Sequence, residues 1–149
     1  MSWSFRKIGL EDFETLLEWR NNPEVYRHFF SPYPVPLENH KKWIEKVIQN
    51  PQIFFLIASY EQVPAGTVNF DFNEDFSKAE VGIYLDPKFH GKRLGGEMLS
   101  YAEKEAIKKY PQLKKIIAKV LVENIASEKM FEKVGYQKHF VQLEKNINI

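Results

Sequence analysis

The sequence predicts an α/β fold of the α+β kind, in which helices cover both faces of a mixed, mostly antiparallel central sheet. Along the chain, apolar residues switch between the two-residue period of strands and the three-to-four-residue period of helices. Clusters of proline, glycine and asparagine separate these segments, and no repeat or linker divides residues 1–149, so we expect one domain. The predicted order is β-α-α-α-β-β-β-α-β-α-β-β, in which a three-strand meander precedes α-β-α-β and indicates a sheet covered on both sides.

The first third of the chain is predicted to be mostly helical. A strand at residues 3–8 alternates apolar and polar side chains, and residues 10–20 carry an apolar stripe at helical spacing. Pro23 fits the first turn of a short helix that we expect to run to Phe30. Prolines make residues 31–36 a loop, and a further apolar stripe predicts a helix from Leu37 to about Asn50.

Strands dominate the middle of the chain, where apolar runs are bounded by turn residues. Pro111 ends a long helix, Asn124 is suited to cap a second one, and Gly135 suits the turn that closes it. The expected elements are strands at 53–58, 65–72 and 78–85, a helix at 95–110, a strand at 115–122, a helix at 125–133, and strands at 136–141 and 142–149.

The composition excludes several classes of function. The absence of cysteine excludes a disulfide scaffold, a thiolate metal site and a cysteine nucleophile, and the four histidines lack the spacing of zinc ligands. A formal net charge of +1 is too small for a general nucleic-acid surface. The first residues lack the pattern of a signal peptide, and no apolar run approaches the roughly 18 residues of a membrane span. We therefore expect a soluble, cytoplasmic protein without a metal.

Residues 80–98 are the most informative stretch. A predicted strand ends at Leu85, a glycine-containing loop follows at 91–96, and a helix begins near its end. The first turn of a helix presents unpaired N–H groups and the positive end of the helix dipole, and Lys92 and Arg93 add positive charge. These features predict a cradle for a diphosphate, with a plain strand-to-helix turn as the alternative. The loop has neither the Walker spacing nor Gly-x-Gly-x-x-Gly.

Three stretches together resemble the GNAT acetyltransferase family. Residues 79–87 resemble the family's fourth strand, residues 89–96 its acetyl-CoA loop, and residues 124–136 its later asparagine-containing segment. The resemblance covers nearly the whole chain and implies a GNAT-like fold with acetyl-CoA as cofactor. It also implies that pantetheine lies between strands four and five, and that a strand-four N–H polarises the thioester carbonyl. The implied cofactor-binding residues are Val81, Ile83, Leu85, His90, Gly91, Lys92, Arg93, Leu94, Gly95, Gly96, Asn124, Ser127 and Phe131.

The chain departs from the family pattern at three positions. His90 stands at the first position of the loop, and Arg93 stands where the family usually has glycine. We expect Arg93 to point one backbone N–H in a different direction and to offer its guanidinium to a phosphate instead. Phe131 stands where many members have the tyrosine that is often assigned as the acid for the leaving thiolate. The thiolate then leaves unprotonated or takes a proton from water, Tyr84 or Tyr136, and the sequence does not choose among these.

The resemblance implies Glu80 as the catalytic base, because some family members carry their base at this strand-four position. Strand alternation puts Glu80, Gly82 and Tyr84 on one face and Val81 and Ile83 on the other. A carboxylate in an otherwise apolar strand is suited to accept the proton of an amine, directly or through water. The alternative is a solvated or salt-bridged Glu80 near a strand end.

Residues 18–25 and 37–44 resemble two subgroups of the family, which differ in their acceptor. One acetylates the N-termini of ribosomal proteins, and the other acetylates the 4-amino group of UDP-linked 4-amino-4,6-dideoxy sugars in pseudaminic acid synthesis. The Trp-Arg-Asn stretch, the Leu-Glu-x-His helix start and the strand at 54–57 look closer to the sugar-nucleotide subgroup. The alternatives are acetylation of protein N-termini or small amines, and a module that binds acyl-CoA without catalysis.

This resemblance implies that Arg20, Tyr33 and His40 contact the acceptor, a small-molecule amine. Arg20 either meets the diphosphate of a sugar nucleotide or pairs with an acidic neighbour. We expect Phe29 and Trp43 to belong to the core rather than to the pocket. No nucleic-acid or membrane partner is expected, and a homodimer is compatible with the sequence.

Overall fold

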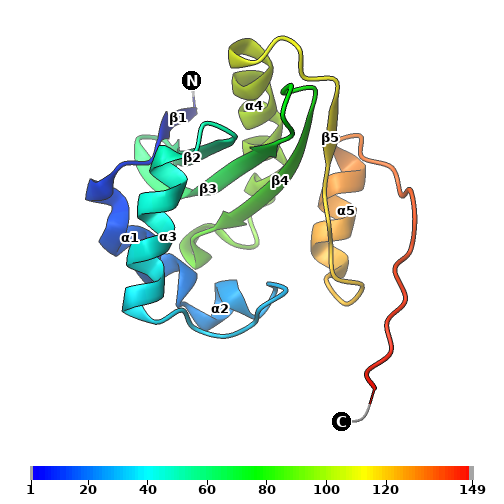
Figure 1. Ribbon diagram of the computed structural model, residues 1–149, viewed down its shortest axis with the longest axis horizontal. Coiled ribbons are helices and arrows are strands. Elements are labelled where there is room, and N and C mark those ends of the chain that lie inside the picture. The colour runs from blue at the N-terminus through cyan, green and yellow to red at the C-terminus, as the bar shows by residue number, and fades with distance from the viewer. Residues whose placement is uncertain (1, 148–149) are drawn as a thin grey trace.

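The computed structural model describes residues 2–147, and a five-stranded sheet forms its centre (Figure 1). The strands are β1 (Trp3–Lys7), β2 (Ile53–Tyr60), β3 (Val63–Phe72), β4 (Lys78–Leu85) and β5 (Lys115–Ile117), and they lie in this order across the sheet. Neighbours from β1 to β4 pair antiparallel, whereas β4 and β5 pair parallel. The prediction of a mixed, mostly antiparallel sheet is therefore confirmed.

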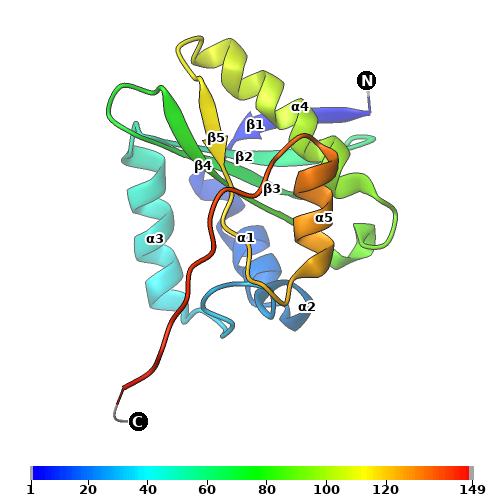
Figure 2. The ribbon, with the colours of Figure 1, turned by 90° about the vertical axis from the view of Figure 1, so that its right-hand side faces the viewer.

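Helices cover both faces of this sheet, with α3 and α4 on opposite sides (Figures 1 and 2). The helices are α1 (Phe13–Arg20), α2 (Pro23–Tyr26), α3 (Leu37–Gln49), α4 (Leu94–Lys109) and α5 (Ile125–Lys133), with 3₁₀ turns η1 (Leu10–Asp12) and η2 (Pro87–Phe89). One core joins the sheet to α4 and α5 around Phe70 and Met98. A second core joins the opposite face to α1 and α3 around Leu16 and Ile44. The prediction of two covered faces is confirmed.

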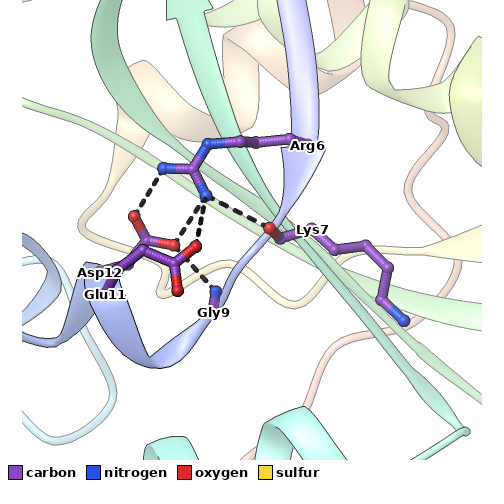
Figure 3. A network of polar contacts seen from close by, with 5 residues as sticks. All are labelled: Arg6, Lys7, Gly9, Glu11 and Asp12. Carbon is purple, nitrogen blue, oxygen red and sulfur yellow. Dashed lines mark hydrogen bonds and ion pairs between the residues drawn. The ribbon is translucent and has the colours of Figure 1, made fainter.

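A buried carboxylate fixes the turn between β1 and α1 (Figure 3). The Asp12 side chain accepts two hydrogen bonds from the guanidinium of Arg6, at 2.6 and 2.8 Å, and one from the Gly9 N–H at 2.9 Å. The bonds from Arg6 are the largest cause of a lowered pKa of Asp12, which keeps this carboxyl ionised. The network therefore ties the 3₁₀ turn η1, from which α1 continues, to the end of β1.

Three of the expected elements are shorter in the structure than predicted. The helix expected at 10–20 is a 3₁₀ turn followed by α1, and the short second helix ends at Tyr26 rather than Phe30. The strand expected at 115–122 ends at Ile117.

The predicted strands at 136–141 and 142–149 are wrong over residues 136–147, which form no strand, and residues 148–149 lie outside the described part. The chain turns at Gly135, with φ of 107°, and then runs where no neighbouring strand supplies hydrogen bonds. In the described part of the chain, no helix is both long and apolar enough to cross a membrane.

Candidate active site

A gap opens in the sheet where β4 and β5 diverge. The two strands pair at three positions, ending with Glu80 opposite Ile117, and the described residues show no pairing between them beyond that point. The other edge of β4 pairs with β3 as far as Leu85. One edge of the second half of β4 is therefore free of strand partners.

The backbone of β4 presents its polar groups to this gap at every second residue. At the end of the β3–β4 ladder the Asp86 N–H donates to the Ala65 carbonyl at 2.7 Å, so Asp86 faces β3. Because the direction of backbone groups alternates in an antiparallel ladder, Val81, Ile83 and Leu85 point theirs away from β3. These are the three strand residues that the sequence analysis singled out for the cofactor.

The loop at 91–96 leads from the end of β4 into the first turn of α4. The Nε2 atom of His90 lies 2.9 Å from the Leu85 carbonyl, which ties the loop to the strand. Arg93 is the N-cap of α4, with φ of 59° and ψ of 29°. Arg93 thus takes the left-handed conformation that glycine adopts readily, so its side chain does not prevent a glycine-like backbone here. The N–H groups of this turn stay available to an anion.

A cavity of about 1400 Å³ extends through the gap and reaches both sides of the sheet. Single-ligand pockets usually measure about 300–1,000 Å³, so this cavity has room for a cofactor and an acceptor side by side. Its walls include most of the predicted site residues, namely Arg20, His40, Glu80, Val81, Ile83, Leu85, His90, Gly91, Arg93, Leu94, Gly95, Gly96, Asn124, Ser127 and Phe131. Lys92 and Tyr33 do not line it. The structure therefore brings together residues that lie far apart in the sequence.

Asn124 and Phe131 form part of the wall on α5. The Asn124 side chain accepts a hydrogen bond from the Ser127 N–H at 3.3 Å and so caps this helix. Phe131 is buried, and its ring contacts Tyr136 edge to face at 5.0 Å. A β-carbon added to Gly95 would lie 3.0 Å from the Met130 sulfur, so the first turn of α4 packs closely against α5.

Glu80 lies at the point where the sheet divides. Its carboxylate is 3.1 Å from the Nζ atom of Lys119, and its side chain is 43% exposed. On the neighbouring strand β3, Asp71 lies opposite Glu80. The Asp71 carboxylate accepts a hydrogen bond from the Asn69 amide at 3.0 Å. Burial, with a smaller contribution from the Glu80 charge, raises the pKa of Asp71. The surroundings of Glu80 are thus charged, in contrast to the apolar setting of its strand neighbours.

Sequence reasoning missed Lys119 and Asp71. The ion pair joins the segment after β5 to β4, and nothing in a linear sequence indicates that contact. A signal for Asp71 exists, because the register of two antiparallel strands joined by a short turn puts Asp71 opposite Glu80.

Of the two tyrosines considered as acids, only Tyr84 lines the cavity. Burial strongly raises the pKa of Tyr84, whose ring packs against Trp19 at 6.2 Å and Phe29 at 5.8 Å. Its hydroxyl is therefore protonated at neutral pH. Tyr136 instead donates to Glu103 on α4 at 2.5 Å and is absent from the cavity wall.

Arg20 lies half-buried in the cavity wall without an acidic partner. Two of its N–H groups donate to the carbonyls of Ser31 and Tyr33 at 3.2 and 3.1 Å, and the guanidinium lies 4.6 Å from the centre of the Phe29 ring. Among residues 2–147 no carboxylate lies within 4.0 Å of it. Tyr33 holds this loop through its backbone, and its side chain is 71% exposed.

His40 is buried and well packed. Its Nε2 atom lies 3.0 Å from the Phe13 carbonyl, and its ring stacks on Trp43 at 5.3 Å. Burial is the main cause of a lowered pKa of His40, so the imidazole is neutral at pH 7. Phe29, which was expected in the core, lines the cavity instead, whereas Trp43 packs against the second core as expected and also lines the cavity. The acceptor side of the cavity is therefore largely aromatic.

The comparisons with known proteins agree with this geometry. The family described as "Acetyltransferase (GNAT) domain" matches residues 4–137. Uncharacterized protein MJ1062 of Methanocaldococcus jannaschii is 31% identical over 137 residues, which cover 89% of this chain and 28% of that protein. Acetyltransferase PseH of Campylobacter jejuni is 26% identical over 102 residues, which cover 66% of this chain and 63% of that protein. The chain therefore spans less than two thirds of either curated relative.

Among solved structures, spermidine N-acetyltransferase from Vibrio cholerae, in complex with CoA and spermine, superimposes with a TM-score of 0.85. The match covers 98% of this chain and 87% of that one, at 19% sequence identity. At this sequence identity, the match shows only that the two chains share a fold.

Proposed function

The chain belongs to the acetyltransferase (GNAT) family, whose acetyl donor is acetyl-CoA, and from this premise we propose that its acceptor is the amino group of a sugar linked to a nucleoside diphosphate. The main support for an acetyl-transfer reaction is the free backbone edge of β4, which faces the cavity beside the first turn of α4. Backbone groups in such a position bind an extended amide chain, and unpaired helix N–H groups bind a diphosphate.

We propose that the diphosphate of acetyl-CoA lies on the N–H groups of residues 91–96 and that pantetheine runs along Val81, Ile83 and Leu85. One of these strand N–H groups then polarises the thioester carbonyl as negative charge develops on its oxygen. Asn124, through the helix that it caps, supports the opposite wall.

In the proposed mechanism, Glu80 accepts the proton of the attacking amine, directly or through one water. The Nζ atom of Lys119 lies 3.1 Å from this carboxylate. The nitrogen forms a bond to the acetyl carbon, and the carbon–sulfur bond breaks. Tyr84 lines the cavity, but burial raises its pKa and makes its hydroxyl a weaker acid, so the sulfur leaves as a thiolate or takes a proton from water. The products are an acetamide and free CoA.

Arg20 supports a sugar nucleotide as the acceptor. A guanidinium has five N–H donors, and the loop carbonyls occupy two of those of Arg20. A half-buried cation without a carboxylate partner is suited to an anionic ligand group such as a diphosphate. The rings of Phe29 and Trp43 offer flat apolar surfaces for a base or a sugar. A polyamine would instead place like charge beside Arg20, which disfavours that alternative.

The test is to incubate the chain with acetyl-CoA and one of three acceptors, a UDP-4-amino-4,6-dideoxy sugar, spermidine or an N-terminal peptide. Release of CoA is followed with a thiol reagent, to which the chain itself contributes no cysteine. We expect release with the sugar nucleotide. Release only with spermidine or the peptide would refute the sugar assignment, and CoA binding without any turnover would favour a non-catalytic module.

Arg20→Gln should raise the KM for the sugar nucleotide at least about tenfold with little change in kcat, because a charge-assisted contact to the ground-state ligand is lost. The matched control is Arg27→Gln, since Arg27 pairs with Glu24 at the surface and does not line the cavity. Glu80→Gln should lower kcat while CoA still binds. Turnover that survives this change would exclude Glu80 as the base.

A further inference from the structure

Three residues form one row across the sheet on the acceptor side of the cavity. Phe55 of β2 pairs with Asn69 of β3, and Asn69 pairs with Gly82 of β4. All three residues line the cavity. Because alternate residues of a strand share a face, this row lies between the position of Glu80 and that of Tyr84. Asn69 is the polar side chain of the row, and it therefore lies beside the proposed base.

The missing side chain of Gly82 makes room for the Asn69 amide. A β-carbon added to Gly82 would lie 2.5 Å from the Oδ1 atom of Asn69 and 3.3 Å from its Nδ2 atom. The Nδ2 atom donates a hydrogen bond to the Asp71 carboxylate at 3.0 Å. An ionised carboxylate only accepts hydrogen bonds, so this contact determines which end of the amide is the NH₂ group. The oxygen end therefore occupies the space over Gly82.

The Oδ1 atom of Asn69 is open to a ligand. Among residues 2–147, the hydrogen bond of the Asn69 side chain is the one that its Nδ2 atom donates, and no side chain or N–H donates to Oδ1. An amide oxygen has two lone pairs, so it can accept a hydrogen bond from a molecule in the cavity. A few polar atoms placed in this way in a largely aromatic wall fix the orientation of a bound ligand. Asn69 and Glu80 thus offer two hydrogen-bond acceptors on the same face of the sheet.

We propose that the Oδ1 atom of Asn69 binds one N–H group of the attacking amine and thereby makes the chain selective for primary amines. This inference rests on the proposed transfer of acetyl to an amine. A neutral primary amine has two N–H groups and one lone pair. As the lone pair forms the bond to the acetyl carbon, one proton passes to Glu80, and the sulfur leaves with the electron pair of the carbon–sulfur bond. The other hydrogen stays on the nitrogen, held by Asn69, and becomes the N–H of the acetamide.

A secondary amine does not satisfy both acceptors. Its nitrogen has one N–H group, which has to give its proton to Glu80, and its second carbon substituent then lies against the Oδ1 atom of Asn69. The hydrogen bond to Asn69 is lost, and the nitrogen is no longer held with its lone pair toward the thioester. Asn69 therefore determines specificity at the reacting nitrogen, whatever molecule carries that nitrogen.

The first experiment compares primary amines with their N-methyl derivatives. The probes are a UDP-4-amino-4,6-dideoxy sugar and an N-terminal peptide, each beside a derivative that carries one methyl group on the reactive nitrogen. The unmodified chain should have the higher kcat/KM for the primary amine. Asn69→Ala should reduce this preference about 3- to 10-fold, which is the range expected for one hydrogen bond. The control Asn39→Ala removes an exposed amide of α3 that does not line the cavity, and it should leave the preference unchanged.

The second experiment displaces the amide without removing it. Gly82→Ala puts a β-carbon against the end of the Asn69 side chain, which can rotate away, so the protein should fold with little change in Tm. The displaced amide should reduce the preference for primary amines as Asn69→Ala does. In a chain that carries both substitutions, the added methyl group lies in space that the amide has left. Gly82→Ala should then have no further effect on the preference, which is the non-additivity of two residues that act through one contact.

The outcomes separate this inference from the proposed function. Release of CoA with a primary amine, together with an unchanged preference in Asn69→Ala, would overturn the inference and leave the transfer reaction in place. An equal effect of Gly82→Ala with and without the Asn69 amide would also contradict the inference, because the methyl group would then act by itself. Absence of CoA release with every amine would overturn both.

Discussion

Replacing Arg93 separates the conformation of the cofactor loop from its charge. Arg93 caps α4 in the left-handed region, with φ of 59°, and its side chain lies on the cavity wall. Arg93→Gly removes the side chain and the steric strain together, whereas Arg93→Ala removes the guanidinium and keeps the β-carbon. The difference between the two variants therefore reports the backbone alone.

The expected magnitudes follow from this geometry. A left-handed conformation costs a residue with a β-carbon about 1–2 kcal/mol, and glycine gives back about 0.5–1 kcal/mol through the entropy of the unfolded chain. Arg93→Gly should therefore be more stable than Arg93→Ala by about 0.5–1 kcal/mol, or about 1–4 °C in Tm at this chain length. If Arg93 meets a phosphate as expected, both variants lose a charge-assisted contact worth about 1–2 kcal/mol at an exposed site, so each should bind CoA about 5- to 30-fold more weakly.

Differential scanning fluorimetry measures Tm, and isothermal titration calorimetry measures the affinity for CoA and for dephospho-CoA. If the two variants melt at the same temperature, the left-handed conformation of Arg93 carries no strain and the reasoning fails. If each variant loses as much affinity for dephospho-CoA as for CoA, Arg93 does not meet the 3′-phosphate.

Three further predictions concern the turn between β1 and α1, the contact between β3 and β4, and the loop at 91–96. Asp12→Asn should lower the free energy of unfolding by about 1–2 kcal/mol at pH 7, because Arg6 loses its charged acceptor. Since Arg6 lowers the pKa of Asp12, this difference in the free energy of unfolding should persist above about pH 4. It should vanish as the pH falls through the pKa of Asp12 in the folded state. Urea unfolding at several pH values measures this dependence. Gly66→Ala should lower the free energy of unfolding by about 2 kcal/mol or more in the same assay, because a β-carbon there would lie 2.2 Å from the Tyr84 carbonyl oxygen. An unchanged midpoint of urea unfolding would contradict this close approach. Gly95→Val should abolish measurable heat of CoA binding, because its side chain would meet Met130 and crowd the loop, and unchanged affinity would argue against the diphosphate cradle.

The sequence predicted those elements whose signals are local. Apolar runs between turn residues are enough to find β2, β3 and β4, since such runs have few alternatives to a buried strand. The loop at 91–96 and the cap at Asn124 depend on neighbouring residues only, and the structure has both where they were expected.

The contacts that escaped prediction depend on tertiary structure. The Glu80–Lys119 pair forms only because β5 stops after Ile117 and the chain beyond it passes the end of the paired region. Phe29 was expected in the core because an aromatic residue in a cavity wall has the same sequence pattern as one in a core. Alternation at residues 136–147 predicted a strand, yet a strand needs a neighbour, and the pattern does not say which chain supplies it.

The ion pair at the fork of the sheet links the shape of the cavity to its proposed chemistry. Lys119 pairs with Glu80 at the point where β4 gains a free edge, so one contact marks both the proposed base and the start of the proposed cofactor groove. With side chains 59% and 43% exposed, such a pair contributes only about 0–1 kcal/mol. In the proposed mechanism, the ammonium group of the acceptor therefore displaces Lys119 at little cost and takes its place beside the carboxylate. In this proposal the carboxylate keeps a cationic partner throughout, first Lys119 and then the acceptor.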